Sequence, residues 1–290
     1  MAVVGRAIAH GAVTIVNAIS CGLGAALGVD LWTEASVKLT GEPGVVEGKI
    51  MSDPEESPVL TEKTVHRVLR HLNLDKEHGA HVETRSNIPI ARGLKSSSAA
   101  ANAIALATLA ALNADVEDIT VVNLGVDAAM EAGVTITGAF DDACASYFGN
   151  IVVTDNRSRR VLKRFAAKDD YTVLIHAPPH KVYTAESGVD KMRLIAREVE
   201  TIHQEALLGN YWAAMTLNGL VYSAVLGYDP SAAVEALSAG AVAASLSGKG
   251  PAVAAVVPAE NVDVVKDAWE SREGNIIETK VNREKAHALT

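Results

Sequence analysis

The sequence predicts an α+β protein of two parts, each with strands and helices layered around an apolar core. Short β-rich runs open the chain at 12–19 and 31–39, and helical patterns follow from residue 61. After Gly149 the pattern changes to a hairpin, a strand and long helical segments. This change places a soft boundary at 150–165, which we draw between a part over 1–155 and a part over 156–290.

In the N-terminal part, we expect strands at 12–19, 31–39 and 81–85 and helices at 61–72, 98–112 and 121–132. The first of these helices carries Val65, Val68 and Leu69 at helical spacing. The second is almost entirely alanine, leucine and isoleucine, which predicts burial on most of its sides. The glycine-rich segment 21–28 is expected to connect the first two strands, either as a plain turn or as a hairpin that leaves room for a ligand.

In the C-terminal part, a hairpin is expected at 151–155 and 161–165, around the basic turn 156–160. A strand at 171–177 ends at Pro178. Helical patterns at 185–208, at 211–226, from 231 onward and at 262–270 alternate with strands at 252–257 and 276–281. This alternation predicts a second sheet with its own helices.

Composition restricts the class of protein. Of the 290 residues 49% are apolar and 21% charged, and the net charge of −9 argues against a nucleic-acid partner. We find no uninterrupted apolar run of about 18 residues, so no membrane partner is expected. The N-terminus lacks the basic segment of a signal peptide, and Cys21 and Cys144 lack metal-site spacing. These features predict a cytoplasmic protein.

The most informative segment is 88–102, which reads as an extended stretch, a glycine turn, a run of serines and an alanine-rich helix. The first N–H groups of a helix lack intrahelical acceptors and favour anions, so this order of parts predicts a phosphate site. Lys95 would add a point charge there. The alternative is an ordinary loop whose serines only cap the helix. The residues assigned to the site are Pro89, Ile90, Ala91, Arg92, Gly93, Leu94, Lys95, Ser96, Ser97, Ser98 and Ala99.

Two further segments fit a phosphate-binding cleft. The glycine-rich run at 245–252 contains Gly248, Lys249 and Gly250, which would close a nucleotide cleft or form an ordinary loop. Asp141 and Asp142 lie in a segment of small and apolar residues, where burial of carboxylates is costly without a cation, a substrate hydroxyl or a basic partner. One of them could instead cap a helix.

Two common nucleotide motifs are missing. The sequence G-x-x-x-x-G-K-[ST] of a P-loop does not occur. Gly22, Gly24 and Gly28 miss the dinucleotide spacing G-x-G-x-x-G by one residue, which argues against a dinucleotide site.

The three segments, in this order, resemble the motifs of the GHMP kinase superfamily. The second family motif, P-x-x-x-G-L-x-S-S-[AS], matches Pro89 through Ser98, the third matches 247–251, and the Gly-x-x-Asp element matches Gly138 to Asp141. Within the superfamily, the chain most resembles the archaeal-type shikimate kinases. That resemblance rests on 9–12 and 30–31, on the three serines beside Lys95, and on 138–144.

The resemblance implies the two-domain GHMP kinase fold, with the active site between the domains. The N-terminal domain would be a ribosomal-protein-like α/β domain with a left-handed β-α-β element, and the C-terminal domain would be ferredoxin-like. The implied reaction is phosphorylation of the 3-hydroxyl of shikimate by ATP with Mg²⁺, on the route to chorismate. The alternatives are another GHMP kinase, particularly homoserine kinase, or a non-catalytic protein on the same fold. Either a monomer or a homodimer is compatible with the sequence.

The chemistry of phosphoryl transfer suggests roles for individual residues. Asp141 would accept or orient the proton of the attacking hydroxyl, Lys95 would stabilise charge on the transferred group, and Ser97 and Glu131 would bind Mg²⁺. One position departs from the family. Many GHMP kinases have Pro-Gly-Lys or Pro-Gly-Arg near the N-terminus, where this chain has His-Gly-Ala at 10–12. Either Lys95, Lys38 or Lys249 replaces that base, or Asp141 acts mainly by orientation. Arg92 and the arginines of 157–160 are candidates to meet a substrate carboxylate, with solvent-exposed turn charges as the alternative.

Overall fold

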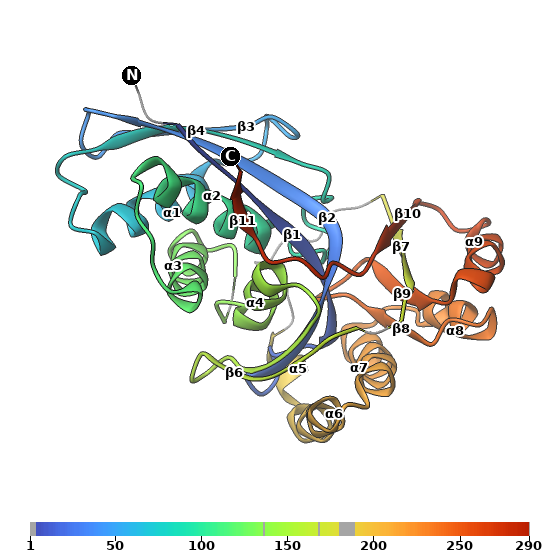
Figure 1. The fold of residues 1–290 in the computed structure, drawn as a ribbon. Helices are drawn as coiled ribbons and strands as arrows, with labels where there is room; N and C mark the ends of the chain where they lie inside the picture. Colours follow the sequence, from blue (N-terminus) through green and yellow to red (C-terminus); the bar gives the residue numbers. More distant parts are fainter. Residues whose placement is uncertain (1–3, 136, 168, 180–188, 290) are drawn as a thin grey trace.

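The computed structural model describes residues 4–135, 137–167, 169–179 and 189–289. They form two β-sheets with helices packed against each, as the predicted α+β class requires (Figure 1). The helices and strands of the N-terminal half lie mainly on the larger sheet, and those of the C-terminal half mainly on the smaller one.

The larger sheet has seven strands. Its main path runs β11-β1-β2-β4-β3, and β5 pairs with β2 and then with β6. All neighbours are antiparallel except β3 and β4, which are parallel and are joined through α1 as a β-α-β unit. The strands are β1 (Val4–Val16), β2 (Leu23–Thr40), β3 (Val46–Ile50), β4 (Gly79–Ser86), β5 (Ile151–Asp155), β6 (Arg160–Phe165) and β11 (His287–Leu289).

The first two strands are much longer than predicted. The chain reverses at 17–22, so most of the glycine-rich segment expected as their connection lies inside β2. Residues on this part of β2 are buried on both faces, because the end of the strand lies between α4 and the second sheet's core. Burial on both faces removes the alternation by which a strand is recognised in a sequence.

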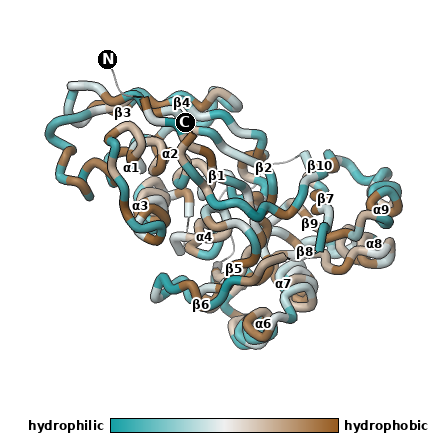
Figure 2. The backbone as a smooth tube through the Cα atoms, viewed as in Figure 1, coloured by the Kyte–Doolittle hydropathy of each residue, from teal (hydrophilic) through white to brown (hydrophobic). Residues whose placement is uncertain are grey.

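Helices α1 (Val59–His71), α2 (Ser96–Ala111) and α4 (Phe140–Phe148) contact strands of the larger sheet, and α3 (Asp118–Glu131) packs against these three helices. Helix α2 lies against β1 and β2 and carries no charged residue, in agreement with its predicted burial. Figure 2 shows the opposite pattern at the tip of the β5–β6 hairpin, where hydrophilic residues project away from the core.

The smaller sheet has the strand order β10-β7-β9-β8, all antiparallel. In chain order the elements form a β-α-β-β-α-β pattern, which is the predicted ferredoxin-like arrangement. The strands are β7 (Thr172–Ala177), β8 (Ala243–Leu246), β9 (Val253–Val257) and β10 (Asn275–Lys280). The helices are α5 (Val189–Arg193), α6 (Ala196–Leu208), α7 (Tyr211–Leu226), α8 (Ser231–Ser238) and α9 (Val262–Trp269), the last preceded by a 3-10 turn at Ala259–Asn261. The start of the helix predicted from residue 185 lies outside the described residues.

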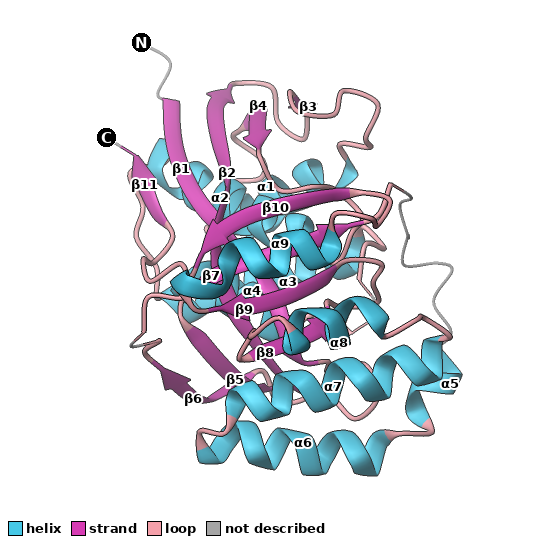
Figure 3. Cartoon of the chain, turned by 90° about the vertical axis from the view of Figure 1, so that its right-hand side faces the viewer, coloured by secondary structure: helices cyan, strands magenta, loops and turns pink. Residues whose placement is uncertain are grey.

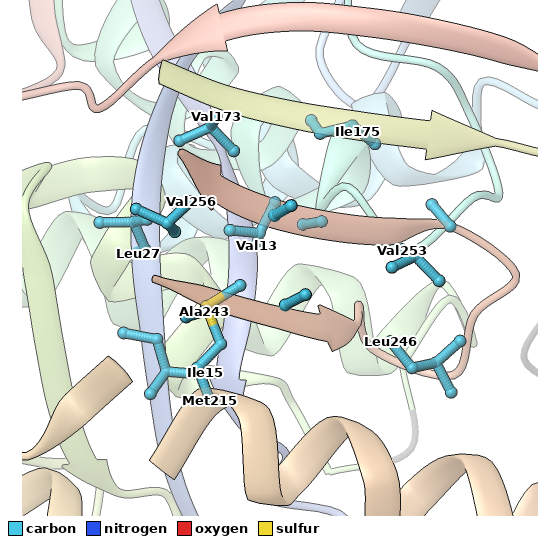
Figure 4. Close-up of a cluster of buried hydrophobic side chains, with 14 of the residues drawn as sticks. Val13, Ile15, Leu27, Val173, Ile175, Met215, Ala243, Leu246, Val253 and Val256 are labelled. Atoms are coloured by element: carbon cyan, nitrogen blue, oxygen red, sulfur yellow. The ribbon is translucent and has the colours of Figure 1, made fainter. Parts of the chain in front are cut away.

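The two sheets share one apolar core. Leu27 of β2 lies beside Val256 of β9, and Ile15 of β1 lies beside Met215 of α7, as Figure 4 shows. Val13 of β1 and Val173 of β7 belong to the same buried cluster. Figure 3 shows the small sheet and its helices in front of β1 and β2. The halves are therefore joined by apolar packing at the ends of the two long strands.

The chain crosses between the sheets more than once. Strand β11, at the C-terminus, pairs with β1 of the larger sheet, and β6 also belongs to that sheet. Pairing with β11 gives the backbone groups at that edge of β1 partners that an open edge would lack. The boundary between 155 and 156 stays a prediction, and the larger sheet takes strands from both sides of it.

Among the described residues, no helix has the length and apolar character needed to cross a bilayer.

Candidate active site

A cavity of about 390 Å³ lies where the starts of α2 and α4 meet β1 and the loop between β8 and β9. Most of the predicted site residues line it: Ile90, Ala91, Gly93, Leu94, Lys95, Ser96, Ser97, Ser98, Asp141, Gly248, Lys249 and Gly250. Pro89, Arg92, Ala99 and Glu131 are not among its lining residues. The structure therefore brings together segments that are about 50 and 150 residues apart in the sequence.

The predicted phosphate loop enters α2 through three left-handed residues. The φ angles are 56° at Ala91, 80° at Gly93 and 64° at Lys95, and two of these residues are not glycine. Such strain persists where the surrounding structure imposes it, often at ligand sites. The N-cap position is Lys95, and none of the described side chains caps the helix. The serines at 96–98 thus lie inside the first turn, where N–H groups lack intrahelical acceptors.

The two glycine-rich loops touch each other. The hydroxyl of Ser247 donates a hydrogen bond of 2.7 Å to the carbonyl oxygen of Gly93. A Cβ atom on Gly93 would lie 2.1 Å from the carbonyl oxygen of Ser247, so only glycine allows this approach. The contact places the loop at 248–250 directly over the phosphate loop.

Thr14 joins both loops from β1. Its buried Oγ1 accepts hydrogen bonds of 2.8 Å from the backbone N–H of Gly248 and from Nζ of Lys95. Thr14 could not be selected from the sequence, because a threonine in a buried strand is ordinary.

Lys95 supplies a cation beside the carboxylate pair. Its Nζ lies 3.2 Å from Oδ1 of Asp142, and only 7% of the lysine side chain is exposed. Ala12, at the position of the family's N-terminal base, is fully buried. The carboxylate that Lys95 pairs with is Asp142 and not Asp141, and its replacement of the family's N-terminal base stays a prediction.

The other two candidate lysines differ in position. Lys38 lies near the far end of β2, opposite Val4 of β1, and does not line the cavity. Lys249 does line it, and burial together with the nearby Lys95 lowers the pKa of Lys249 to about 8. A buried ammonium with a lowered pKa favours the binding of an anion.

Asp141 is the most buried carboxylate of the site, with 4% of the residue exposed. The Nδ2 group of Asn156 donates a 2.7 Å hydrogen bond to Oδ1 of Asp141, and Oδ1 of Asn156 accepts a 3.1 Å bond from the backbone N–H of Asp141. Burial and the charge of Asp142 raise the pKa of Asp141 to about 7. Burial also raises the pKa of Asp142, against the opposing effect of Lys95.

Gly24 makes room for Asp141. A Cβ atom on Gly24 would lie 2.4 Å from Oδ2 of Asp141 and 2.7 Å from its Cγ. The glycine-rich segment 21–28 was expected either to form a plain turn or to leave room for a ligand. At Gly24 it instead leaves room for the side chain of Asp141.

The structure places Glu131 away from the cavity. Its carboxylate pairs with Arg67, which also lies 3.7 Å from Asp127. A role as magnesium ligand stays a prediction for Glu131, and it would require this ion pair to open. Ser97, by contrast, lines the cavity in the first turn of α2. Among the described residues, no cluster of three or more histidine, cysteine or acidic side chains could hold a metal by itself.

The basic residues considered for a substrate carboxylate have protein partners. Arg157 pairs with Asp155, Arg159 pairs with Asp127 at 2.6 Å, and Arg92 donates to the carbonyl oxygen of Pro179. None of these three arginines lines the cavity.

Among the residues not selected from the sequence are Thr14, which lines the cavity, and Gly24 and Asn156, which adjoin Asp141. Asn156 begins the basic hairpin turn, where asparagine is usually explained by turn geometry. Only its distance from Asp141 in space shows another role.

Comparison with known proteins agrees with this geometry. Residues 60–150 match the family model of the GHMP kinases N-terminal domain. A shikimate kinase of Methanosarcina mazei is 49% identical over 284 residues, which cover 97% of this chain and 96% of that protein. A shikimate kinase of Halobacterium salinarum is 42% identical, with 95% and 96% covered. The chain therefore belongs to the GHMP kinases, in the family of these shikimate kinases.

Solved structures show the same fold at low sequence identity. The mevalonate kinase of Methanococcus jannaschii gives a TM-score of 0.77 at 18% identity, covering 96% of this chain and 98% of that one. A homoserine kinase of Cytophaga hutchinsonii gives 0.76 at 18%, covering 100% and 98%. The predicted two-domain GHMP fold is confirmed.

Proposed function

We propose that this protein transfers the γ-phosphoryl group of ATP to the 3-hydroxyl of shikimate, giving shikimate 3-phosphate and ADP for chorismate and aromatic amino-acid synthesis. The observation that carries the proposal is one cavity that contains both an uncapped helix N-terminus and a buried aspartate pair with a lysine. The near full-length similarity to shikimate kinases supports the choice of acceptor.

The helix terminus suits the phosphates. The N–H groups of the first turn of α2 and the positive end of its dipole favour negative charge, and Lys95 and Lys249 add cations beside it. The contact between the loops at Gly93 and Ser247 encloses this end of the cavity, which strengthens electrostatic interactions there.

Asp141 suits the acceptor hydroxyl. In the proposed step, the hydroxyl oxygen forms a bond to phosphorus while the bond to the leaving ADP oxygen breaks, and Asp141 accepts the hydroxyl proton. A carboxylate with a pKa of about 7 is a better base near neutral pH than an ordinary aspartate. Lys95 offsets charge on the transferred group.

Magnesium fits the donor set around Ser97. Mg²⁺ usually keeps several waters and binds through few protein oxygens together with substrate phosphates, so the hydroxyl of Ser97 suffices as a contact from α2. When bound, the ion would neutralise phosphate charge. We further propose a cytoplasmic enzyme, since neither Cys21 nor Cys144 is in a disulfide. Either a monomer or a homodimer is compatible with this proposal.

The test is an ADP-release assay with shikimate and homoserine side by side, with the product identified by mass spectrometry. We expect ADP release with shikimate but not with homoserine, and a product phosphorylated at the 3-hydroxyl of shikimate. Turnover of homoserine instead would assign a different acceptor. Turnover of neither compound would favour a binding protein on this fold.

A further inference from the structure

Asn156 lies at the β5–β6 turn, opposite the start of α4, and only 7% of the residue is exposed. It makes two hydrogen bonds to a single residue, one to the carboxylate of Asp141 and one to the backbone N–H of Asp141. The orientation of the amide follows from chemistry: because a backbone N–H can only donate, the atom facing it is the oxygen, and the NH₂ group faces the carboxylate.

The amide is itself held in place. The Oγ1 hydroxyl of Thr154 lies 2.7 Å from Oδ1 of Asn156, and the backbone N–H of Asn156 donates to the carbonyl oxygen of Gly22. Thr154 is anchored in turn, since its carbonyl oxygen lies 3.1 Å from Nε2 of His203 on α6. Asn156 is thus held by hydrogen bonds from β5 and from the turn before β2, in addition to those with Asp141.

We propose that Asn156 is a positioning residue for the phosphoryl transfer, which holds the carboxylate of Asp141 in one orientation and in its charged form. This inference rests on the proposed function for its kinetic consequence, although the contact itself does not. A donor to a carboxylate favours its ionised form. Gly24 lies beside Asp141, and the absence of a Cβ atom at Gly24 leaves the space that Oδ2 of Asp141 occupies.

Other titratable groups near Asp141 also affect its pKa, some raising it and others lowering it. Asp142 and Cys144 face it from α4, Lys95 from the start of α2 and Tyr222 from α7. Lys249 faces Asp142 from the glycine loop. Lys95 favours the charged form of Asp141 and Asp142 opposes it, and Asn156 adds to the effect of Lys95.

The test is the pH dependence of kcat in Asn156→Asp. This change keeps the shape and the acceptor oxygen but replaces the donor to Asp141 with a second carboxyl group. We expect the acid limb of the profile to move about one pH unit upward, so that kcat falls about fivefold at pH 7 and largely returns at pH 9. Asn156→Ala, which also removes the donor, should move the limb in the same direction and serves if the first variant does not fold.

Asn282 offers a matched control. It is buried, its Oδ1 accepts from the backbone N–H of Glu284 and its Nδ2 donates to the carbonyl oxygen of the same residue. Asn282→Asp should leave the acid limb in place. An unchanged limb in both folded Asn156 variants, or an equal shift in Asn282→Asp, would overturn the inference, since a merely structural asparagine would alter kcat evenly at all pH values.

A second readout needs no activity. The difference in melting temperature between the parent and its Asp141→Asn derivative, followed from pH 5 to 9, reports the pKa of Asp141. It should reveal a higher pKa when the comparison is made in the Asn156→Asp background. If the protein did not phosphorylate shikimate, the proposed function would fail while this measurement still decided whether Asn156 controls Asp141.

Discussion

Replacing Gly24 with alanine tests whether catalysis depends on the position of Asp141. The new Cβ atom would lie 2.4 Å from Oδ2 of Asp141, whereas ordinary van der Waals contacts begin near 3.4 Å. The carboxylate must therefore move by about 1 Å, and a displacement of that size from the reacting atoms costs roughly 10²-fold in rate. In free energy this corresponds to about 2.7 kcal/mol of lost transition-state stabilisation.

The assay is steady-state kinetics of ADP release, with melting temperature measured on the same preparations. We expect kcat to fall about 100-fold while KM for ATP changes little, because the phosphate loop is not disturbed. Gly41→Ala is the control, since a Cβ atom there meets nothing within 4 Å and Gly41 lies just beyond the far end of β2.

The reasoning is refuted if folded Gly24→Ala retains kcat within about twofold of the parent. A double variant sharpens the result. If Gly24→Ala acts through Asp141, it should add almost nothing to the loss already caused by Asp141→Asn, because effects through one residue are not additive.

Three further predictions concern charge, metal and loop contact. Asp141→Asn should lower kcat by orders of magnitude yet stabilise the fold. Because the pKa of about 7 in the folded protein exceeds the ordinary value of 3.8, the stability contributed by Asp141 is lost as pH rises from about 4 to about 7. Thermal melts of Asp141→Asn should therefore show a gain of up to about 4 kcal/mol at pH 8 and little at pH 4. A gain equal at both pH values would contradict the buried charge. Ser97→Ala should raise the Mg²⁺ concentration needed for half-maximal rate. Glu131→Gln should leave that concentration within about twofold, since Glu131 pairs with Arg67. A Mg²⁺ titration in which only Glu131→Gln raises the concentration would identify Glu131 as the ligand. Thr14→Val should raise KM for ATP and destabilise the fold by about 1–3 kcal/mol, because Nζ of Lys95 and the N–H of Gly248 lose their acceptor. If kinetics and denaturant melts equalled those of the parent, the two loops would be held without Thr14.

Local sequence patterns predicted much of this structure. Helix α1 was predicted from apolar residues at helical spacing, α2 from its nearly continuous alanine, leucine and isoleucine, and the hairpin of β5 and β6 from its basic turn. Helical patterns also predicted α3 and α7. The short strands β3 and β8 were not predicted from the sequence. Strand β11 was missed as well, since its place depends on a free edge of β1 far away in the sequence.

Within the site, too, features that depend on neighbouring residues were predicted and features that depend on distant residues were not. The phosphate loop, Asp141 and the glycine loop at 248–250 could be named because each is a short motif whose chemistry depends on neighbours in sequence. Glu131 was assigned from its place one turn before the loop, but its carboxylate meets Arg67 of α1 instead of the cavity. A charged side chain takes whichever partner folding brings near, and sequence spacing does not reveal that partner.

The sequence by itself determined the α+β class, the kinase family and the three segments that form the cavity. Only the tertiary structure decided how they act together: Lys95 pairs with Asp142, Thr14 links the two loops, and Asn156 and Gly24 fix Asp141. The physical reason is the distance along the sequence between the residues that interact. Helix termini, glycine turns and apolar periodicity depend on residues a few positions apart, whereas ion pairs, shared acceptors and the space for a carboxylate depend on atoms that meet only after the two sheets have packed.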